Sequence, residues 1–176
     1  MGAVLCRRAF RGFPSAWNRT LQVWLKMLSQ KAKYALRAML TLASAEDGEA
    51  LLISDIAEAK NLPKRFLEQI LLDLKHHGLV QSKRGKNGGY ALLKRPEAIT
   101  FADIVRIIDG PMAPLPCLSR MAYQRCEDCV DEDLCELRRV FGRAHAASIA
   151  ILEATSLADA LAEGADRDRL PLARSL

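Results

Sequence analysis

A basic, amphipathic segment followed by a glycine-rich turn is the feature of this sequence that most restricts its fold. Residues 63–78 read PKRFLEQILLDLKHHG, with Pro63 suited to the first turn of a helix and Gly78 to its end. Two short apolar runs, 79–82 and 90–93, then flank a turn that contains three glycines, which predicts a β-hairpin. The inward face of the helix is predicted from its helical spacing to hold Phe66, Leu67, Ile70, Leu71 and Leu74.

Two further helices are expected before this segment. Residues 29–45 have apolar side chains at helical spacing, and Ser29 is suited to be the N-cap. A turn at Asp47 and Gly48 precedes a short helix over 54–62, which we expect Ser54 to cap. Asn61 and Pro63 interrupt the chain before the basic helix, so the two helices around them form a candidate helix–turn–helix motif.

The basic helix is the candidate DNA-reading element. If its apolar face is buried, the residues that face outward near its N-terminus are Lys64, Arg65, Glu68 and Gln69. In a major groove, Arg pairs with guanine, Gln with adenine, and Glu accepts from cytosine. An ordinary amphipathic surface helix would show the same pattern, so the helix by itself does not decide between the two interpretations.

The hairpin turn strengthens the DNA interpretation. Lys83, Arg84 and Lys86 accompany the glycines of the turn, and Gly88 belongs to the same group. Cations attract phosphate, and glycine allows a close approach of the backbone. A plain turn with solvent-facing lysines is the alternative, but a wing beside a helix–turn–helix motif would reach the DNA backbone or the adjacent minor groove.

Composition narrows the class of protein. The chain has 176 residues, half of them apolar, and no apolar stretch long enough to span a membrane. The net charge is +5, but 12 basic and 8 acidic residues lie in 27–100, against 9 basic and 13 acidic in 101–176. A basic first half suits a polyanion partner. We find no nucleophile–base pair and no cofactor fingerprint, so no enzyme activity is expected.

Four of the five cysteines lie in one short segment. Cys117, Cys126, Cys129 and Cys135 are separated by eight, two and five residues. Such clustering without a secretory signal indicates metal binding more than a disulfide framework, and a cytoplasmic location. Thiolates suit iron–sulfur clusters or zinc, and spacing alone does not separate the two. A metal-free thiol switch and a metal-binding adaptor for protein partners stay open as well.

The remaining segments complete the expected fold. Thr100 and Asp103 form a capping box that opens a helix ended by Gly110, and the loop 111–132 follows. A long helix over about 133–155 has a coiled-coil-like apolar seam, and 156–162 form a short last helix. The fold class is therefore mainly α with a small β-hairpin. The apolar seam comprises Leu134, Leu137, Val140, Phe141, Ala144, Ser148, Ile151 and Leu152.

We divide the chain by these features. Residues 1–26 carry five basic groups and no acid, and we expect a disordered or spurious extension, with a transit peptide or a DNA-contacting arm as alternatives. The winged helix–turn–helix domain covers 27–96, and a linker helix with the cysteine loop covers 97–135. Residues 136–162 hold the long and the final helix, and 163–176 a frayed tail.

The residues from Met27 to Ala160 resemble the winged-helix iron–sulfur repressors that govern cluster assembly, nitric-oxide response and iron uptake in bacteria. The resemblance rests on SQKAKYALRAMLTLA, on FLEQILLDLKHHGLVQSKRGKNGGYALL and on the cysteine loop with the later TSLADAL. It implies that Arg65, Glu68 and Gln69 lie at a DNA face and Arg84 on a wing. It also implies a homodimer, formed through the long helix, on a palindromic operator.

The same resemblance implies a bound iron–sulfur cluster, 2Fe–2S or 4Fe–4S, that gates repression. Cys117, Cys129 and Cys135 match the three cysteines of these relatives, whereas Cys126 is additional. Some relatives have a histidine three residues after the last cysteine, where this chain has Arg138. We therefore hypothesise that Cys126 is the fourth ligand, with Asp128, Glu132 or a small molecule as competitors, and zinc as the alternative metal.

Overall fold

The computed structural model describes residues 28–45, 49–85 and 88–165. The expectations for 1–26, for the turn at Asp47 and Gly48, for Lys86 and for the chain beyond 165 fall outside these ranges. The described part is mainly helical with one two-stranded antiparallel sheet, which confirms the predicted fold class. No helix within these ranges is both long enough and apolar enough to cross a lipid bilayer.

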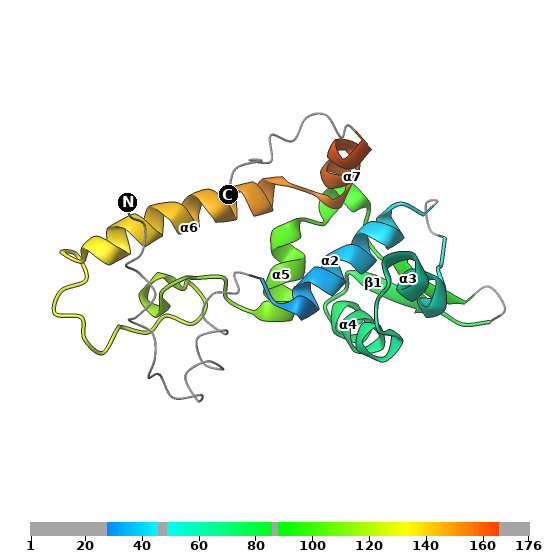
Figure 1. Ribbon diagram of the computed structural model, residues 1–176, viewed down its shortest axis with the longest axis horizontal. Helices are drawn as coiled ribbons and strands as arrows, with labels where there is room; N and C mark the ends of the chain where they lie inside the picture. Colours follow the sequence, from blue (N-terminus) through cyan, green and yellow to red (C-terminus); the bar gives the residue numbers. More distant parts are fainter. Residues whose placement is uncertain (1–27, 46–48, 86–87, 166–176) are drawn as a thin grey trace, which may run out of the picture.

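Three helices form the head of the molecule: α2 (Gln30–Ala43), α3 (Ile53–Lys60) and α4 (Lys64–His76). Figure 1 shows α4 beside α3, with α2 crossing next to them. Asn61 ends α3 in the left-handed region, with φ of 51°, and lets the chain turn into α4. These helices share one apolar core that includes Met39, Ile56, Leu67, Ile70, Leu71 and Leu74.

The predicted hairpin is present. Strand β1 (Val80–Lys83) pairs antiparallel with β2 (Gly89–Leu92), with Val80 opposite Leu92. A bridge between Leu51 and Tyr90 joins the hairpin to the segment before α3 through N–H···O bonds of 2.9 Å in both directions. Gly89 has φ of 146°, and a Cβ atom there would lie 2.3 Å from the carbonyl oxygen of Leu51, so only glycine fits.

Helices α5 (Phe101–Asp109) and α7 (Leu157–Ala165) close the other side of the head. The predicted capping box of Thr100 and Asp103 opens α5, with both reciprocal hydrogen bonds formed. Leu157 is fully buried, and its N–H donates to the carbonyl oxygen of Ile99 at 3.0 Å. The chain therefore returns to the head after the long excursion through the cysteine loop.

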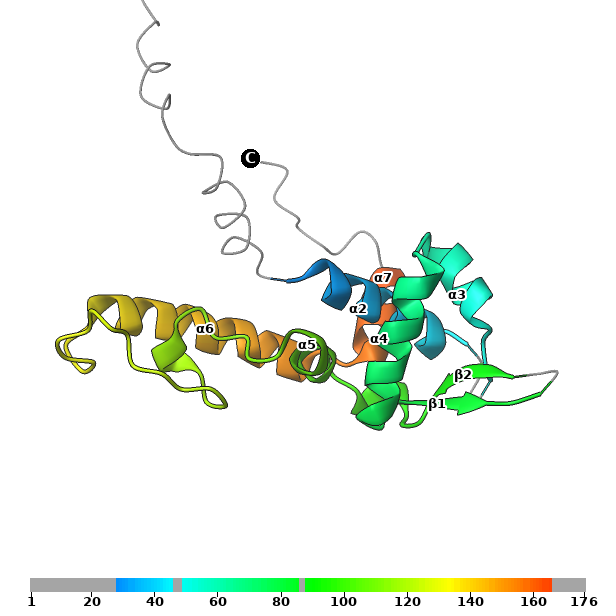
Figure 2. The ribbon, with the colours of Figure 1, turned by 90° about the horizontal axis from the view of Figure 1, so that it is seen from below.

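Helix α6 (Glu136–Ala154) projects away from the head, and the cysteine loop runs alongside it. Figure 2 shows the same separation, with the hairpin at the opposite end of the molecule from the start of α6. No residue of α6 is buried. Leu137, Val140 and Ile151 are each more than 60 % exposed, so the predicted apolar seam faces solvent in a single chain.

Four local predictions were wrong in detail. Leu52, not Ser54, precedes the first turn of α3, and no side chain caps that helix. Pro63 is the N-cap of α4 and not its first helical residue. Phe66 is 39 % exposed because it lies at the edge of the core, where it meets the Tyr34 ring edge-on at 5.7 Å. The long helix begins only at Glu136, so Leu134 lies in the loop.

Candidate nucleic-acid interface and cysteine loop

The outer face of α4 carries all four side chains that the sequence predicted to face outward near the start of the DNA-reading helix. Lys64, Arg65, Glu68 and Gln69 are exposed, whereas Leu67, Ile70 and Leu71 on the opposite face are buried. The first turn of α4 contains no acid, and its last turn holds Lys75 and His76. No side chain caps the N-terminal end, so this end offers the positive pole of the helix dipole and the cations Lys64 and Arg65 to an anion.

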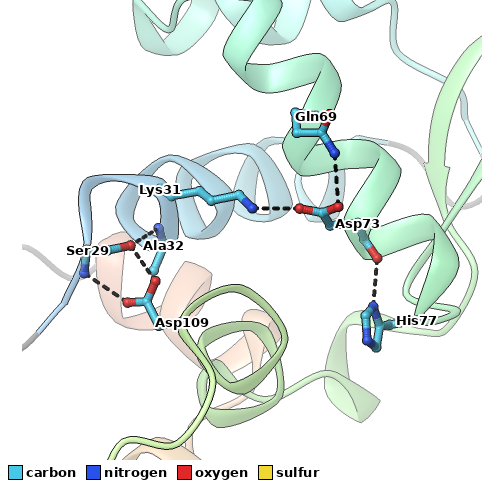
Figure 3. A network of polar contacts seen from close by, with 7 residues as sticks. All are labelled: Ser29, Lys31, Ala32, Gln69, Asp73, His77 and Asp109. Carbon is cyan, nitrogen blue, oxygen red and sulfur yellow. Dashed lines mark hydrogen bonds and ion pairs between the residues drawn. The ribbon is translucent and has the colours of Figure 1, made fainter.

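One acidic side chain on α4 is tied to a neighbouring helix (Figure 3). Lys31 of α2 donates to Asp73 at 2.7 Å, and Gln69 Nε2 donates to the other carboxylate oxygen at 3.2 Å. The hydrogen bond from Lys31, followed by the one from Gln69, lowers the pKa of Asp73, although partial burial opposes this. Local sequence patterns do not indicate this pair, because Lys31 and Asp73 lie 42 residues apart.

The hairpin presents two of its basic residues to solvent. Lys83 and Arg84 are exposed at the end of β1, and Lys86 lies outside the described residues. Gly88 is buried, its N–H donates to the carbonyl oxygen of Gly85 at 2.9 Å, and a Cβ atom there would lie 2.7 Å from the carbonyl oxygen of Lys83. Gly88 is therefore engaged in the turn itself, and its contact with DNA stays a prediction.

The cysteine loop brings its four thiols into one region. Cys117 is buried in the 3₁₀ turn η2 (Pro116–Leu118), while Cys126 and Cys129 are half-buried. Cys135 is the N-cap of α6, and its Sγ accepts from the N–H of Arg138 at 3.5 Å. None of the four is in a disulfide. The chain therefore holds Cys135 at the junction between the loop and the projecting helix.

The thiols influence one another electrostatically. Desolvation, and then a hydrogen bond with Cys117, raises the pKa of Cys126. Desolvation, and then the neighbouring Cys135, raises the pKa of Cys129. Both shifts favour protonated thiols, and a bound cation would oppose them because thiolates are the metal ligands.

The donor chemistry of the loop therefore fits an iron–sulfur cluster or zinc, both of which take thiolate ligands. Within 28–45, 49–85 and 88–165, however, no three His, Cys, Asp or Glu side chains are arranged so that they could hold a metal ion. Ligation by these cysteines would require the loop to rearrange.

Glu132 and Arg125 hold further parts of the loop. Glu132 accepts from Arg138 at 2.9 Å and from the hydroxyl of Tyr123 at 2.5 Å, and its side chain is only 18 % exposed. Arg125 donates to the carbonyl oxygens of Cys129 and Val130 at 3.0 and 2.9 Å. Glu132 was hypothesised as a competing ligand, but here it is engaged with Arg138, the residue at the position where some relatives have histidine.

A basic helix–turn–helix motif with a β-hairpin wing, followed by a projecting helix, defines a winged-helix DNA-binding regulator. The family model for Rrf2, iron-dependent transcriptional regulator, matches residues 28–163, and the chain belongs to this family.

Individual relatives support the same assignment. An Rrf2-like HTH-type regulator from Rhodobacter capsulatus is 50 % identical over 141 residues, which are 78 % of this chain and 94 % of that protein. NsrR from Geobacillus kaustophilus is 32 % identical over 138 residues, covering 78 % and 91 %.

Solved structures agree with the fold. CymR, the global cysteine regulator of Bacillus subtilis, matches with a TM-score of 0.66 and 32 % identity over 77 % of this chain and 96 % of that chain. IscR from T. potens matches with a TM-score of 0.62 and 26 % identity over 81 % and 90 %. The chain is thus a transcriptional regulator of the helix–turn–helix type.

Proposed function

We propose that this protein is a repressor whose affinity for a palindromic operator is gated by a cysteine-ligated iron–sulfur cluster. The observation that carries the proposal is the continuous connection from the four clustered thiols, through the Cys135 cap, to the projecting helix α6. A change at the thiols would thereby alter the placement of a helix whose apolar residues face solvent.

Each part of the chain has a role in this proposal. Arg65, Glu68 and Gln69 read bases in the major groove, with Lys64 on a phosphate, and Lys83, Arg84 and Lys86 contact the backbone as the wing. The exposed apolar face of α6 joins a second copy of the chain, so that two α4 helices meet successive major grooves. The turn that contains Gly88 supports the wing.

Cys117, Cys126, Cys129 and Cys135 would hold the cluster, which supplies a redox- and nitric-oxide-sensitive centre when bound. Cys126 suits the fourth position because it interacts with Cys117 and lies close to Cys135. Glu132 is already hydrogen-bonded to Tyr123 and Arg138. A coupling of about 1–3 kcal/mol between cluster and DNA would change operator affinity roughly 5- to 150-fold.

The decisive experiment is anaerobic purification, with a visible absorption spectrum and iron and sulfide analysis, followed by binding to duplexes selected from a random library. We expect iron and sulfide in the wild type, a bleached spectrum in Cys126→Ser, and unchanged absorption in the matched control Cys6→Ser, whose cysteine lies outside the loop. Removing the cluster should change operator affinity. Equal affinity with and without the cluster, or one bound zinc ion and no colour, would contradict the gating proposal.

A thiol switch is the second candidate. The hydrogen bond between the thiols of Cys117 and Cys126 favours it, because their oxidation to a disulfide would release two protons and pass two electrons to an oxidant such as a peroxide. If the anaerobic protein contains no metal, and peroxide changes operator affinity in the wild type but not in Cys117→Ser, this second function replaces the first.

A further inference from the structure

We propose that Asp73 is a positioning residue that fixes the orientation of the Gln69 amide and thereby directs the recognition helix toward adenine. The inference rests on the proposed DNA-binding role of α4 and names a specificity determinant within it. Gln69 Nε2 donates to Asp73 Oδ1 at 3.2 Å, one helical turn away on the same face of α4 (Figure 3).

The chemistry of the two side chains sets the orientation. An ionised carboxylate only accepts hydrogen bonds, so it attracts the NH₂ group of Gln69 and disfavours the flipped amide, whose oxygen would face it. The second N–H of Gln69 and its Oε1 then remain available to a base, and the relative positions of this donor and this acceptor are fixed. Adenine offers an acceptor at N7 beside a donor at N6, whereas guanine offers two acceptors, so this arrangement suits adenine.

Lys31 supports the positioning role of Asp73 through its own hydrogen bond to the carboxylate. It approaches from α2, outside the helix–turn–helix motif, and donates to Asp73 Oδ2 at 2.7 Å, which leaves Oδ1 for Gln69. The two side chains are 32 % and 28 % exposed, so solvent screens the pair only in part. Lys31 therefore keeps Asp73 ionised and offsets its charge where α4 would approach phosphate. Without Lys31, the negative charge of Asp73 would repel phosphate and weaken binding to DNA of any sequence.

The competing explanation is that Asp73 and Lys31 only tie α4 to α2. Two variants separate the explanations. Asp73→Asn keeps the shape but removes the preference for one amide orientation, because an asparagine can donate as well as accept. Lys31→Met breaks the tie between the helices but leaves the carboxylate facing Gln69.

The experiment is selection of binding sites from a random duplex library with the full-length protein, accompanied by urea unfolding of each variant. Gln69→Ala should identify the position that Gln69 reads, by a fall of about 5- to 100-fold in the preference for an A·T pair there. Asp73→Asn should lower the preference at that same position, and the double variant should be no worse than Gln69→Ala alone. Lys31→Met should weaken binding to all duplexes while it keeps the adenine preference.

Three results would overturn the inference, and they differ from failure of the proposed function. If Asp73→Asn keeps the adenine preference and loses only stability, Asp73 is a structural tie. If Lys31→Met and Asp73→Asn lower the preference equally, the tie itself is responsible. If Gln69→Ala changes no position while the wild type still binds DNA, Gln69 reads no base. A wild type that binds no duplex would instead contradict the proposed function.

Discussion

Ser29 and Asp109, 80 residues apart, join the beginning of α2 to the end of α5. The backbone N–H of Ser29 donates to Asp109 Oδ2 at 2.9 Å, and its hydroxyl donates to the other carboxylate oxygen. The same hydroxyl oxygen accepts from the N–H of Ala32 at 3.0 Å as the N-cap of α2. The first turn of α2 has no acid of its own, so Asp109 supplies the negative charge that favours a helix N-terminus.

This relationship predicts coupled stability effects. Ser29→Ala should lower the free energy of unfolding by about 1 kcal/mol, because it removes the N-cap. Asp109→Asn should have a smaller effect, and the double variant should lose less than the sum of the two single losses, because they share one network. Urea unfolding measures this. Glu97→Gln is the control, since Glu97 is exposed and pairs with the exposed Arg95. Strict additivity would contradict the coupling.

The close approach of Gly89 to the Leu51 backbone predicts that one added methyl group strongly lowers stability. Gly89→Ala should destabilise the protein by about 2 kcal/mol or more, because the new Cβ would meet the Leu51 backbone at 2.3 Å and φ is positive. Gly164→Ala is the matched control. It lies in α7, and beyond its own helix backbone and chain neighbours no atom of the described residues lies within 4 Å of the added Cβ. It should therefore stabilise by up to about 1 kcal/mol. Equal thermal unfolding of the two variants would show that the described approach to Leu51 is wrong.

The exposed side of α6 predicts the oligomeric state. Val140→Lys combined with Ile151→Lys should convert a dimer into a folded monomer, because both side chains are about two-thirds exposed in the single chain and support no intrachain core. Sedimentation analysis and circular dichroism test this together. Leu93→Lys, at a leucine that is 54 % exposed outside α6, should leave the dimer intact. If the variant with both α6 substitutions is still a dimer, the dimer interface lies outside this face of α6.

The wing predicts a change in salt dependence. Arg84→Ala should weaken binding to all duplexes similarly and reduce the slope of log affinity against log salt by about 1, as expected for loss of one phosphate contact. Arg139→Ala removes an exposed cation of α6, away from the head, and should leave the slope unchanged. A loss confined to one base-pair position would instead indicate base reading by Arg84.

Acid should weaken the fold through two carboxylates. Lys31 and Gln69 lower the pKa of Asp73, and Ser156 lowers the pKa of Asp159, both below the ordinary 3.8. A lowered folded pKa gives stability that is complete above the ordinary value and is lost as pH falls through the folded pKa. Asp73→Asn should therefore cost stability at pH near 7 and cost little at pH near 2. An equal cost at both pH values would show that the carboxylate charge is not involved.

Much of the architecture followed from short-range patterns. Ser29 caps α2, and Thr100 and Asp103 form the capping box of α5. Gly78, with φ of 70°, follows the C-terminus of α4. Each of these signals involves residues within one helical turn, where the local geometry is nearly the same in every protein. At Ser54 and Pro63 the helix boundary lies one or two residues from the predicted position, and no side chain caps either helix where it begins.

The candidate site could be predicted only in part from such short-range patterns. Helical spacing placed Lys64, Arg65, Glu68 and Gln69 on the exposed face, because burial of Leu67 and Ile70 leaves no other orientation. Helical spacing did not reveal that Glu132, which was hypothesised as a competing cluster ligand, is shielded by Tyr123 and Arg138. The contact between Glu132 and Arg138 joins the loop to the first turn of α6, and a periodic sequence pattern does not predict such a contact.

Periodicity, caps and spacing are properties of neighbours along the chain, so they were enough to predict the order of helices and hairpin, the basic outer face of α4 and the clustering of the cysteines. The contacts between distant groups became known from the three-dimensional arrangement: Lys31 with Asp73, Ser29 with Asp109, and the bridge of Leu51 to Tyr90. Such pairs depend on how α2, α4 and α5 pack around a shared core, and packing selects partners by shape and burial across the whole fold.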